Sequence, residues 1–250
     1  TQGYSSAASD VYKRQRMGCG LVHIVTAQEN AEVIRIKLPE AIVTGWSENV
    51  TGEQEADITA AIHKAAAVVI GPGLGQEAGA ERLLDLVLQE AEKLPELPVV
   101  IDADGLNLLA KKRLYSTLGR QYVLTPHLRE MSRLSGKSVQ EIADDMTSAV
   151  MGQQAGATIV LKDARTLVSD GDWLYINLSG NSALSTGGSG DVLSGMIGGL
   201  LAQGCTQRTA ATLAVYMHGL TADQYCESAP PHCMLARDIL EMIPKIGGNS

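Results

Sequence analysis

Residues 99–124, VVIDADGLNLLAKKRLYSTLGRQYVL, contain a strand, a helix and a second strand in direct succession. The apolar triplets Val99–Ile101 and Tyr122–Leu124 predict short strands, and the pattern of residues 107–118 predicts a helix between them. Neither strand alternates apolar and polar residues, so both are expected to be covered on two faces, as in a parallel sheet packed between helices. This unit indicates an α/β fold.

The same alternation of strands and helices continues on both sides of this unit. Further strands are expected at residues 21–26, 68–70 and 158–161, and a hairpin is expected from residues 166–169 and 173–176. Helices are expected at residues 77–93, 138–154, 192–203, 206–226 and 235–243. Ser138 and Glu141 match a capping box that marks the start of the second of these helices. We find no linker or repeat, which favours a single domain.

The composition describes a globular protein and excludes several classes of function. Of 250 residues, 45% are apolar, and 28 acidic residues outnumber 20 basic ones to give a net charge of −8. With no basic cluster to offset it, this charge argues against nucleic acid as a main partner. No apolar run reaches the length of a membrane-spanning helix, so a membrane is not expected as a partner either.

The four cysteines, at positions 19, 205, 226 and 233, form no CxxC pair, which argues against a zinc site or a redox motif. Scattered cysteines of this kind more often pack as small apolar groups in a reducing cytosol, so a cytoplasmic location is expected. Residues 5–15, SSAASDVYKRQ, are polar and lack the apolar centre of a signal peptide. We therefore expect residues 1–16 to be a non-native tail and residues 17–250 to form the domain.

The stretch that carries most chemical information is residues 181–193, NSALSTGGSGDVL. Gly187, Gly188 and Gly190 allow backbone conformations that are closed to other residues, and a helical pattern follows at once. A helix N-terminus offers unpaired N–H groups and the positive end of the helix dipole, so the segment suits an anion. Asp191 stands where a general base beside that anion would act. The stretch therefore predicts phosphoryl transfer.

Two other loops that directly follow predicted strands leave two interpretations open. Open α/β sheets bind their ligands at such loops. The first is 71–75, GPGLG, which fits a ligand loop or a tight turn equally well. In the second, Asp102 and Asp104 can hold a metal or accept ligand hydroxyls. The plainer interpretation makes Asp104 a turn former and Asn107 a helix cap, and it is favoured when the segment is considered alone.

Two further loops follow the next predicted strands. In residues 125–130, TPHLRE, His127 and Glu130 share a face at a helix start, and their position in the layer of the other loops favours a functional role. In residues 162–166, KDART, Lys162 can neutralise nucleotide phosphates while the backbone cradles them. A charged entry into the hairpin explains this second segment equally well.

Taken in order, these segments resemble the ADP/ATP-dependent NAD(P)H-hydrate dehydratases of the ribokinase-like superfamily. The resemblance runs from about residue 17 to residue 246. The matching segments are GLVHIVT (20–26), IGPGLG (70–75), VVIDADGLNLL (99–109), LTPHLREMSRL (124–134), LKDARTLV (161–168) and GNSALSTGGSGDVLSG (180–195). The resemblance implies a three-layer α/β/α sandwich with a mostly parallel central sheet, and a homo-oligomer, a tetramer.

The resemblance also implies an enzyme that uses ADP or ATP, with Mg²⁺, to remove water from a nicotinamide cofactor hydrated on its ring. The phosphoryl group passes to the ring hydroxyl and phosphate is then eliminated. In this scheme Asp191 deprotonates the hydroxyl. The N–H groups of Gly188, Ser189 and Gly190 stabilise the charge that develops on the transferred phosphoryl group.

Binding roles follow from the same resemblance. The hydrate is expected to contact Gly73, Gly75, Asp102, Asn107, His127 and Asp191. The nucleotide is expected to contact Lys162, Asp163, Ala164, Arg165, Thr166 and Gly190. Asp163 stands where the family commonly has glycine. Glu130 is expected to orient a magnesium-bound water, because His127 and Glu130 occupy the place of the Asn-x-x-Glu motif of related kinases.

The sequence departs from the family pattern at its amino end. The first strand and glycine-serine loop that precede GLV in the family are absent, so a strand edge is expected to lie uncovered and the substrate pocket to be incomplete.

One alternative function is that of a kinase of a small vitamin-precursor alcohol with Asp191 in the same role, although His127 argues against it. The other is a nucleotide-binding module without turnover. A dehydrogenase is disfavoured because no GxGxxG fingerprint is present.

Overall fold

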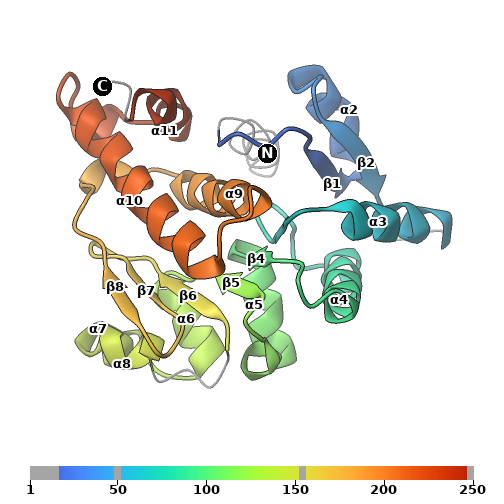
Figure 1. Ribbon diagram of the computed structural model, residues 1–250, viewed down its shortest axis with the longest axis horizontal. Coiled ribbons are helices and arrows are strands. Elements are labelled where there is room, and N and C mark those ends of the chain that lie inside the picture. Colours follow the sequence, from blue (N-terminus) through green and yellow to red (C-terminus); the bar gives the residue numbers. More distant parts are fainter. Residues whose placement is uncertain (1–16, 48–51, 152–155, 247–250) are drawn as a thin grey trace.

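Figure 1 shows the computed structural model of the protein, which describes residues 17–47, 52–151 and 156–246. The expected tail at residues 1–16 and the end of the expected helix 138–154 lie outside the described residues. The strands are β1 (His23–Ala27), β2 (Ile42–Trp46), β3 (Val68–Ile70), β4 (Val99–Ile101), β5 (Tyr122–Leu124), β6 (Thr158–Leu161), β7 (Leu167–Ser169) and β8 (Leu174–Ile176). The helices are α2 (Gln28–Lys37), α3 (Gly52–Lys64), α4 (Ala78–Lys93), α5 (Ala103–Lys112), α6 (Leu128–Ser135), α7 (Val139–Asp144), α8 (Met146–Met151), α9 (Ser189–Ala202), α10 (Gln207–Cys226) and α11 (Ala236–Met242).

The described strands form two sheets. β3 to β8 make a six-stranded sheet in chain order, and β1 pairs with β2 in a separate parallel sheet. β3 to β6 run parallel to their neighbours, whereas β7 is antiparallel to both β6 and β8. The prediction of a mostly parallel sheet that ends in a hairpin is confirmed.

Neighbouring residues of the central strands point to opposite faces of the sheet and therefore enter different cores. Ile101 and Leu124 pack with the helices from α4 to α8, whereas Val100 and Val123 pack with α9, α10 and α11. All four side chains are fully buried. The sheet is thus covered on both sides, with α9 and α10 on one face and α5 and α6 on the other (Figure 1). The expected three layers are confirmed.

Two helices begin earlier than the sequence pattern indicated. α5 begins at Ala103 because the carbonyl of Asp102 accepts the N–H of Gly105 at 3.0 Å directly after β4. Asn107 therefore lies inside the helix, and its interpretation as a cap is wrong. α9 begins at Ser189, which places Asp191 in the first helical turn rather than before the helix.

The helix expected at residues 138–154 is divided. The capping box at Ser138 and Glu141 is confirmed, but α7 ends at Asp144. Asp145 has a non-helical backbone, and its carboxylate accepts the N–H of Ser148 at 2.9 Å, which starts α8. No helix within the described residues is long and apolar enough to cross a membrane.

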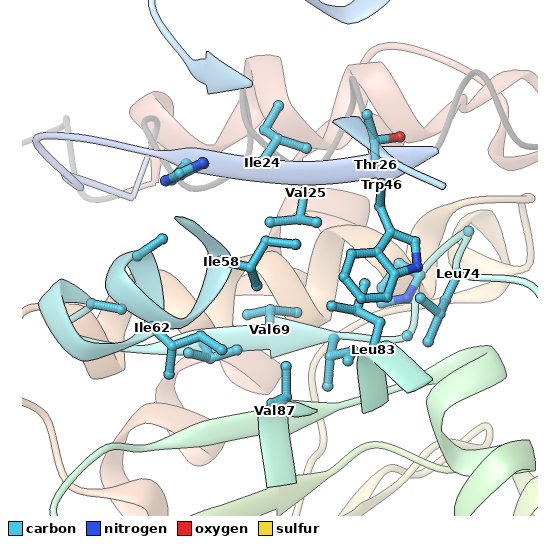
Figure 2. Close-up of a pocket in the computed structure, with 18 of the residues that line it drawn as sticks. Ile24, Val25, Thr26, Trp46, Ile58, Ile62, Val69, Leu74, Leu83 and Val87 are labelled. Atoms are coloured by element: carbon cyan, nitrogen blue, oxygen red, sulfur yellow. The ribbon is translucent and has the colours of Figure 1, made fainter. Parts of the chain in front are cut away.

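The sheet is interrupted between β1 and β3. β1, β2 and α2, of which only β1 was predicted, enclose a small core that includes Ile24 and Ile34. A largely apolar cavity of about 210 Å³ separates β1 from β3. Figure 2 shows Val25 of β1 and Val69 of β3 on opposite sides of it, with Ile58 of α3 beside them. Val69 is partly exposed, whereas every β4 residue is buried, so β3 is an edge strand of the six-stranded sheet and faces the cavity.

The packing of α9 on β3 leaves no space for a side chain at Gly198. A Cβ added there would lie 2.4 Å from Cγ2 of Val69. We expect Gly198→Ala to lower the free energy of unfolding, measured by urea denaturation, by about 1–3 kcal/mol through overpacking. Gly52→Ala, at the start of α3, is the control because a Cβ there would meet none of the described residues within 4 Å. Equal effects of the two substitutions would contradict the close approach.

Candidate functional site

The carboxyl ends of β4, β5 and β6 bring three of the predicted loops together. Nζ of Lys162, after β6, donates to Oδ1 of Asp102, after β4, at 2.8 Å and lies 4.0 Å from Oε2 of Glu130. The N–H of Lys162 also donates to the carbonyl of Pro126 at 2.8 Å. A parallel bridge between His127 and Lys162 continues the β5–β6 register past the strands. The sheet itself therefore positions the lysine.

Lys162 forms a largely buried ion pair. The side chain of Asp102 is 1% exposed and that of Lys162 is 19% exposed. Burial alone would lower the pKa of Lys162, but the carboxylates of Asp102, Glu130 and Asp191 outweigh it and raise that pKa, so the ammonium stays charged. Burial raises the pKa of Glu130, although Lys162 and a backbone hydrogen bond from His127 partly oppose this. Oδ2 of Asp102 is buried and has no hydrogen-bond partner in the described part of the chain.

His127 and Glu130 lie at the start of α6, as the sequence indicated, and they also cap that helix reciprocally, which the sequence pattern did not predict. Nδ1 of His127 accepts the N–H of Glu130 at 3.1 Å, and Oε2 of Glu130 accepts the N–H of His127 at 2.8 Å. Because Nδ1 is an acceptor, the neutral ring carries its proton on Nε2. Burial and the Lys162 cation lower the pKa of His127, which favours this neutral form. The ring is half-exposed and its Nε2 lies 3.4 Å from Oε1 of Glu130, so the N–H donor stands at the edge of the site beside that carboxylate.

The glycine loop, residues 179–190, brings the N-terminus of α9 close to Lys162. Gly188 is the N-cap of α9, with a φ of +85° that disfavours other residues. A Cβ added to Gly190 would lie 3.2 Å from Nζ of Lys162. The N–H of Ser189 donates to the carbonyl of Thr186 at 3.3 Å, whereas the N–H of Gly190 has no acceptor among the described residues. A cation and a helix N-terminus meet here, and both attract an anion.

Asp191 is half-buried in the first turn of α9. Its charge contributes to the raised pKa of Lys162, so the carboxylate lies within electrostatic reach of the ammonium. The candidate base and the anion-binding elements therefore share one site.

The segments predicted to bind the hydrate contain residues that anchor the backbone and residues that line the cavity. Oδ2 of Asp104 accepts the N–H of Gly75 at 3.1 Å and Oδ1 lies 3.5 Å from Nδ2 of Asn107, so Asp104 ties the 71–75 loop to α5. Its interpretation as a simple turn former missed this anchor. Asp102 is bonded to Lys162 and too buried to be an open ligand group. Gly73, with a φ of +65°, lies at the cavity between the sheets.

The three residues that follow Lys162 are more exposed to solvent than Lys162 itself. Asp163, Ala164 and Arg165 are exposed at the turn between β6 and β7. Nη1 of Arg165 donates to the carbonyl of Leu178 at 3.2 Å, and the Thr166 hydroxyl donates weakly to the carbonyl of Asp163, at 3.4 Å. Among the described contacts, none joins these four residues to the start of α9. Their contribution to nucleotide binding stays a prediction.

The described residues contain no group of three or more His, Cys, Asp or Glu side chains that could hold a metal ion. Glu130 faces the ammonium of Lys162 instead. Proteins usually bind Mg²⁺ through one or two carboxylates together with substrate phosphates. The donor set thus fits a magnesium ion that arrives with a nucleotide, and the role of Glu130 toward a magnesium-bound water stays a prediction.

Comparison with known proteins gives a consistent result. A family model described as NAD(P)H-hydrate dehydratase matches residues 14–245. The ADP-dependent (S)-NAD(P)H-hydrate dehydratase of Neisseria meningitidis is 40% identical over 219 residues, which cover 85% of this chain and 70% of that protein. The bifunctional NAD(P)H-hydrate repair enzyme of Coxiella burnetii is 36% identical over 90% of this chain and 44% of its own, so the chain spans less than half of that relative.

A solved structure supports the same relationship. The ADP/ATP-dependent NAD(P)H-hydrate dehydratase from Bacillus subtilis, co-crystallised with ATP and Mg²⁺ and soaked with CoA, is 26% identical to this chain. The two superpose with a TM-score of 0.77, covering 98% of this chain and 87% of that one.

Replacing Lys162 with methionine would leave Asp102 and Glu130 buried without their cation. We expect the free energy of unfolding at pH 8 to fall by about 3–5 kcal/mol, as when one partner of a buried pair is removed. The loss should be smaller at pH 5. Burial already raises the pKa of Glu130 above its unfolded value, and loss of the lysine raises it further, so protonation relieves the folded state as the pH falls.

Urea denaturation at both pH values measures this effect. The double variant Asp102→Asn with Lys162→Met is the control, because it removes both charges and should recover much of the loss. A loss of the same size at pH 5 and pH 8 would show that carboxylate charge is not its cause.

Proposed function

Because the chain belongs to the family of NAD(P)H-hydrate dehydratases, we propose that it converts the S-epimer of hydrated NADH or NADPH back to the intact cofactor, driven by ADP or ATP. The observation that carries this proposal is the meeting of Lys162 with the start of α9 at Gly190, beside Asp191. A cation, a helix N-terminus and a carboxylate are the groups that phosphoryl transfer to a hydroxyl requires.

The proposed reaction converts a poor leaving group into a good one. Asp191 takes the proton of the ring hydroxyl. The oxygen of that hydroxyl forms a bond to the terminal phosphorus of the nucleotide, and the bond from this phosphorus to the bridging oxygen breaks. The ammonium of Lys162 and the N–H of Gly190 stabilise the charge on the transferred group. Magnesium bound with the nucleotide phosphates supplies further positive charge. Phosphate then leaves the ring together with a ring proton, which restores the dihydronicotinamide.

The remaining residues take binding roles in this proposal. The hydrate lies against Gly73 and Gly75, with Asn107 nearby on α5, and the Nε2–H of His127 donates to it. Lys162 binds the nucleotide phosphates, and the 163–166 turn lies along the rest of the nucleotide. Asp102 acts through Lys162 rather than on the hydrate. We further propose a cytoplasmic homo-oligomer, a tetramer.

A direct assay separates this function from the alternatives. The protein is incubated with NADH hydrate or NADPH hydrate, ADP or ATP, and Mg²⁺, and the absorbance of the restored dihydronicotinamide is followed. Recovery that depends on the nucleotide supports the dehydratase. Consumption of ATP with a vitamin-precursor alcohol but not with the hydrate would indicate a kinase, and nucleotide binding without turnover would indicate a binding module.

Asp191→Asn tests the proposed base. The amide keeps the shape of the side chain but cannot take a proton, so turnover should fall by about 10²–10⁴-fold, the usual contribution of a general base. The dissociation constant for ADP, measured by calorimetry, should change much less. Asp172→Asn, on the exposed turn before β8, is the matched control and should leave both quantities unchanged. Full activity of Asp191→Asn would remove Asp191 from the role of base.

A further inference from the structure

Helix α10 holds the beginning of the glycine loop through Asp223. Oδ2 of Asp223 accepts the N–H of Gly180 at 2.8 Å, and Oδ1 accepts from Nδ2 of Asn181 at 2.9 Å. The backbones of the helix and the loop approach closely at this point, because a Cβ added to Gly219 would lie 2.6 Å from the carbonyl carbon of Ser179. One carboxylate therefore fixes two consecutive residues where the loop starts.

The same helix holds the other end of the loop through His218. This side chain is buried, at 7% exposure, and its Nε2 lies 3.1 Å from the carbonyl oxygen of Ser189 and 3.2 Å from its Oγ. A carbonyl oxygen can only accept, so Nε2 carries a proton and donates to the first residue of α9. His218 thus orients the helical turn that contains Gly190 and Asp191.

A loop rich in glycine needs support of this kind. Glycine loses more conformational freedom on ordering than any other residue, and the loop contains Gly180, Gly187, Gly188 and Gly190. Donors stabilise developing charge well only when they are already aimed at it before the reaction. These two attachments, together with the Ser179 hydroxyl that donates to the carbonyl of Tyr216 at 2.9 Å, join the loop to one helix of 20 residues and leave it little freedom to drift.

We propose that His218 and Asp223 are positioning residues that clamp the two ends of the glycine loop to α10 and so aim the N–H of Gly190 at a bound phosphoryl group. Neither residue touches that group in this arrangement, because each acts through the loop backbone. The nature of the bound group rests on the proposed function, whereas the clamp is a property of the free protein.

Four variants test the clamp. His218→Leu removes the donor, and His218→Gln returns an N–H at a similar distance from the backbone. Asp223→Ala removes the half-buried carboxylate and is less disruptive to the core. Thr221→Val is the control for the histidine variants, since the buried Thr221 hydroxyl donates only to the His218 carbonyl within α10. Gln224→Ala is the control for Asp223, because the Gln224 side chain makes no hydrogen bond among the described residues.

The first measurement is amide hydrogen exchange in the free protein. We expect the amides of residues 180–190 to exchange at least about tenfold faster in His218→Leu and Asp223→Ala, because each variant loses hydrogen bonds that restrain the loop. Exchange in His218→Gln and in both controls should stay close to that of the unaltered protein. Unchanged loop exchange in both His218→Leu and Asp223→Ala would overturn the clamp.

The second measurement is the dissociation constant for ADP, determined by calorimetry in the presence of Mg²⁺. It should rise by about tenfold in the two clamp variants and recover in His218→Gln. Faster loop exchange with unaltered ADP affinity would overturn the role in aiming the phosphate donors. If the unaltered protein binds ADP without repairing the hydrate, the proposed function fails while both measurements still decide the clamp.

Discussion

The ion pair between Lys162 and Asp102 is the interaction on which the site depends. It joins the ends of β4 and β6, which flank β5, and it holds a charged ammonium against the start of α9. Removing two charges from water is costly unless they compensate each other. Asp102 is almost fully buried and keeps one oxygen without a partner in the described chain, so the lysine cannot leave it at low cost. The cation is therefore in place before any nucleotide arrives.

The glycine loop depends on a different kind of support. It contains several glycines, which have no side chain to restrain them, and it is attached to α10 through Asp223, His218 and the carbonyl of Tyr216. The anion site is thus assembled from the sheet, which supplies Lys162, and from α10, which holds the start of α9. Both supports are rigid elements, and a site built on them is more precise than one built on free loops.

The sequence predicted the layers better than the contacts. Short apolar triplets such as Val99–Ile101 define buried strands by composition alone, and their bounds are confirmed. The start of α5 was misplaced because a polar segment, Asp102 to Gly105, begins the helix before the apolar pattern does. The pair Lys162 and Asp102 spans 60 residues, so only strand order and register reveal it. His218 lies in an apolar helical pattern, and its polarity was the one available signal of a contact.

The two halves of the candidate site are supported unequally. The nucleotide half rests on β6, whose neighbours β5 and β7 pair with both of its edges, and on α10. The hydrate half includes the 71–75 loop, which continues from β3, a strand that pairs with β4 but faces the cavity on its other side. Asp104 anchors that loop at Gly75, whereas Gly73 lies at the cavity itself. A loop held at one end adapts its shape more easily, so under the proposed function the hydrate would meet the more adaptable part of the site and the nucleotide the more rigid part.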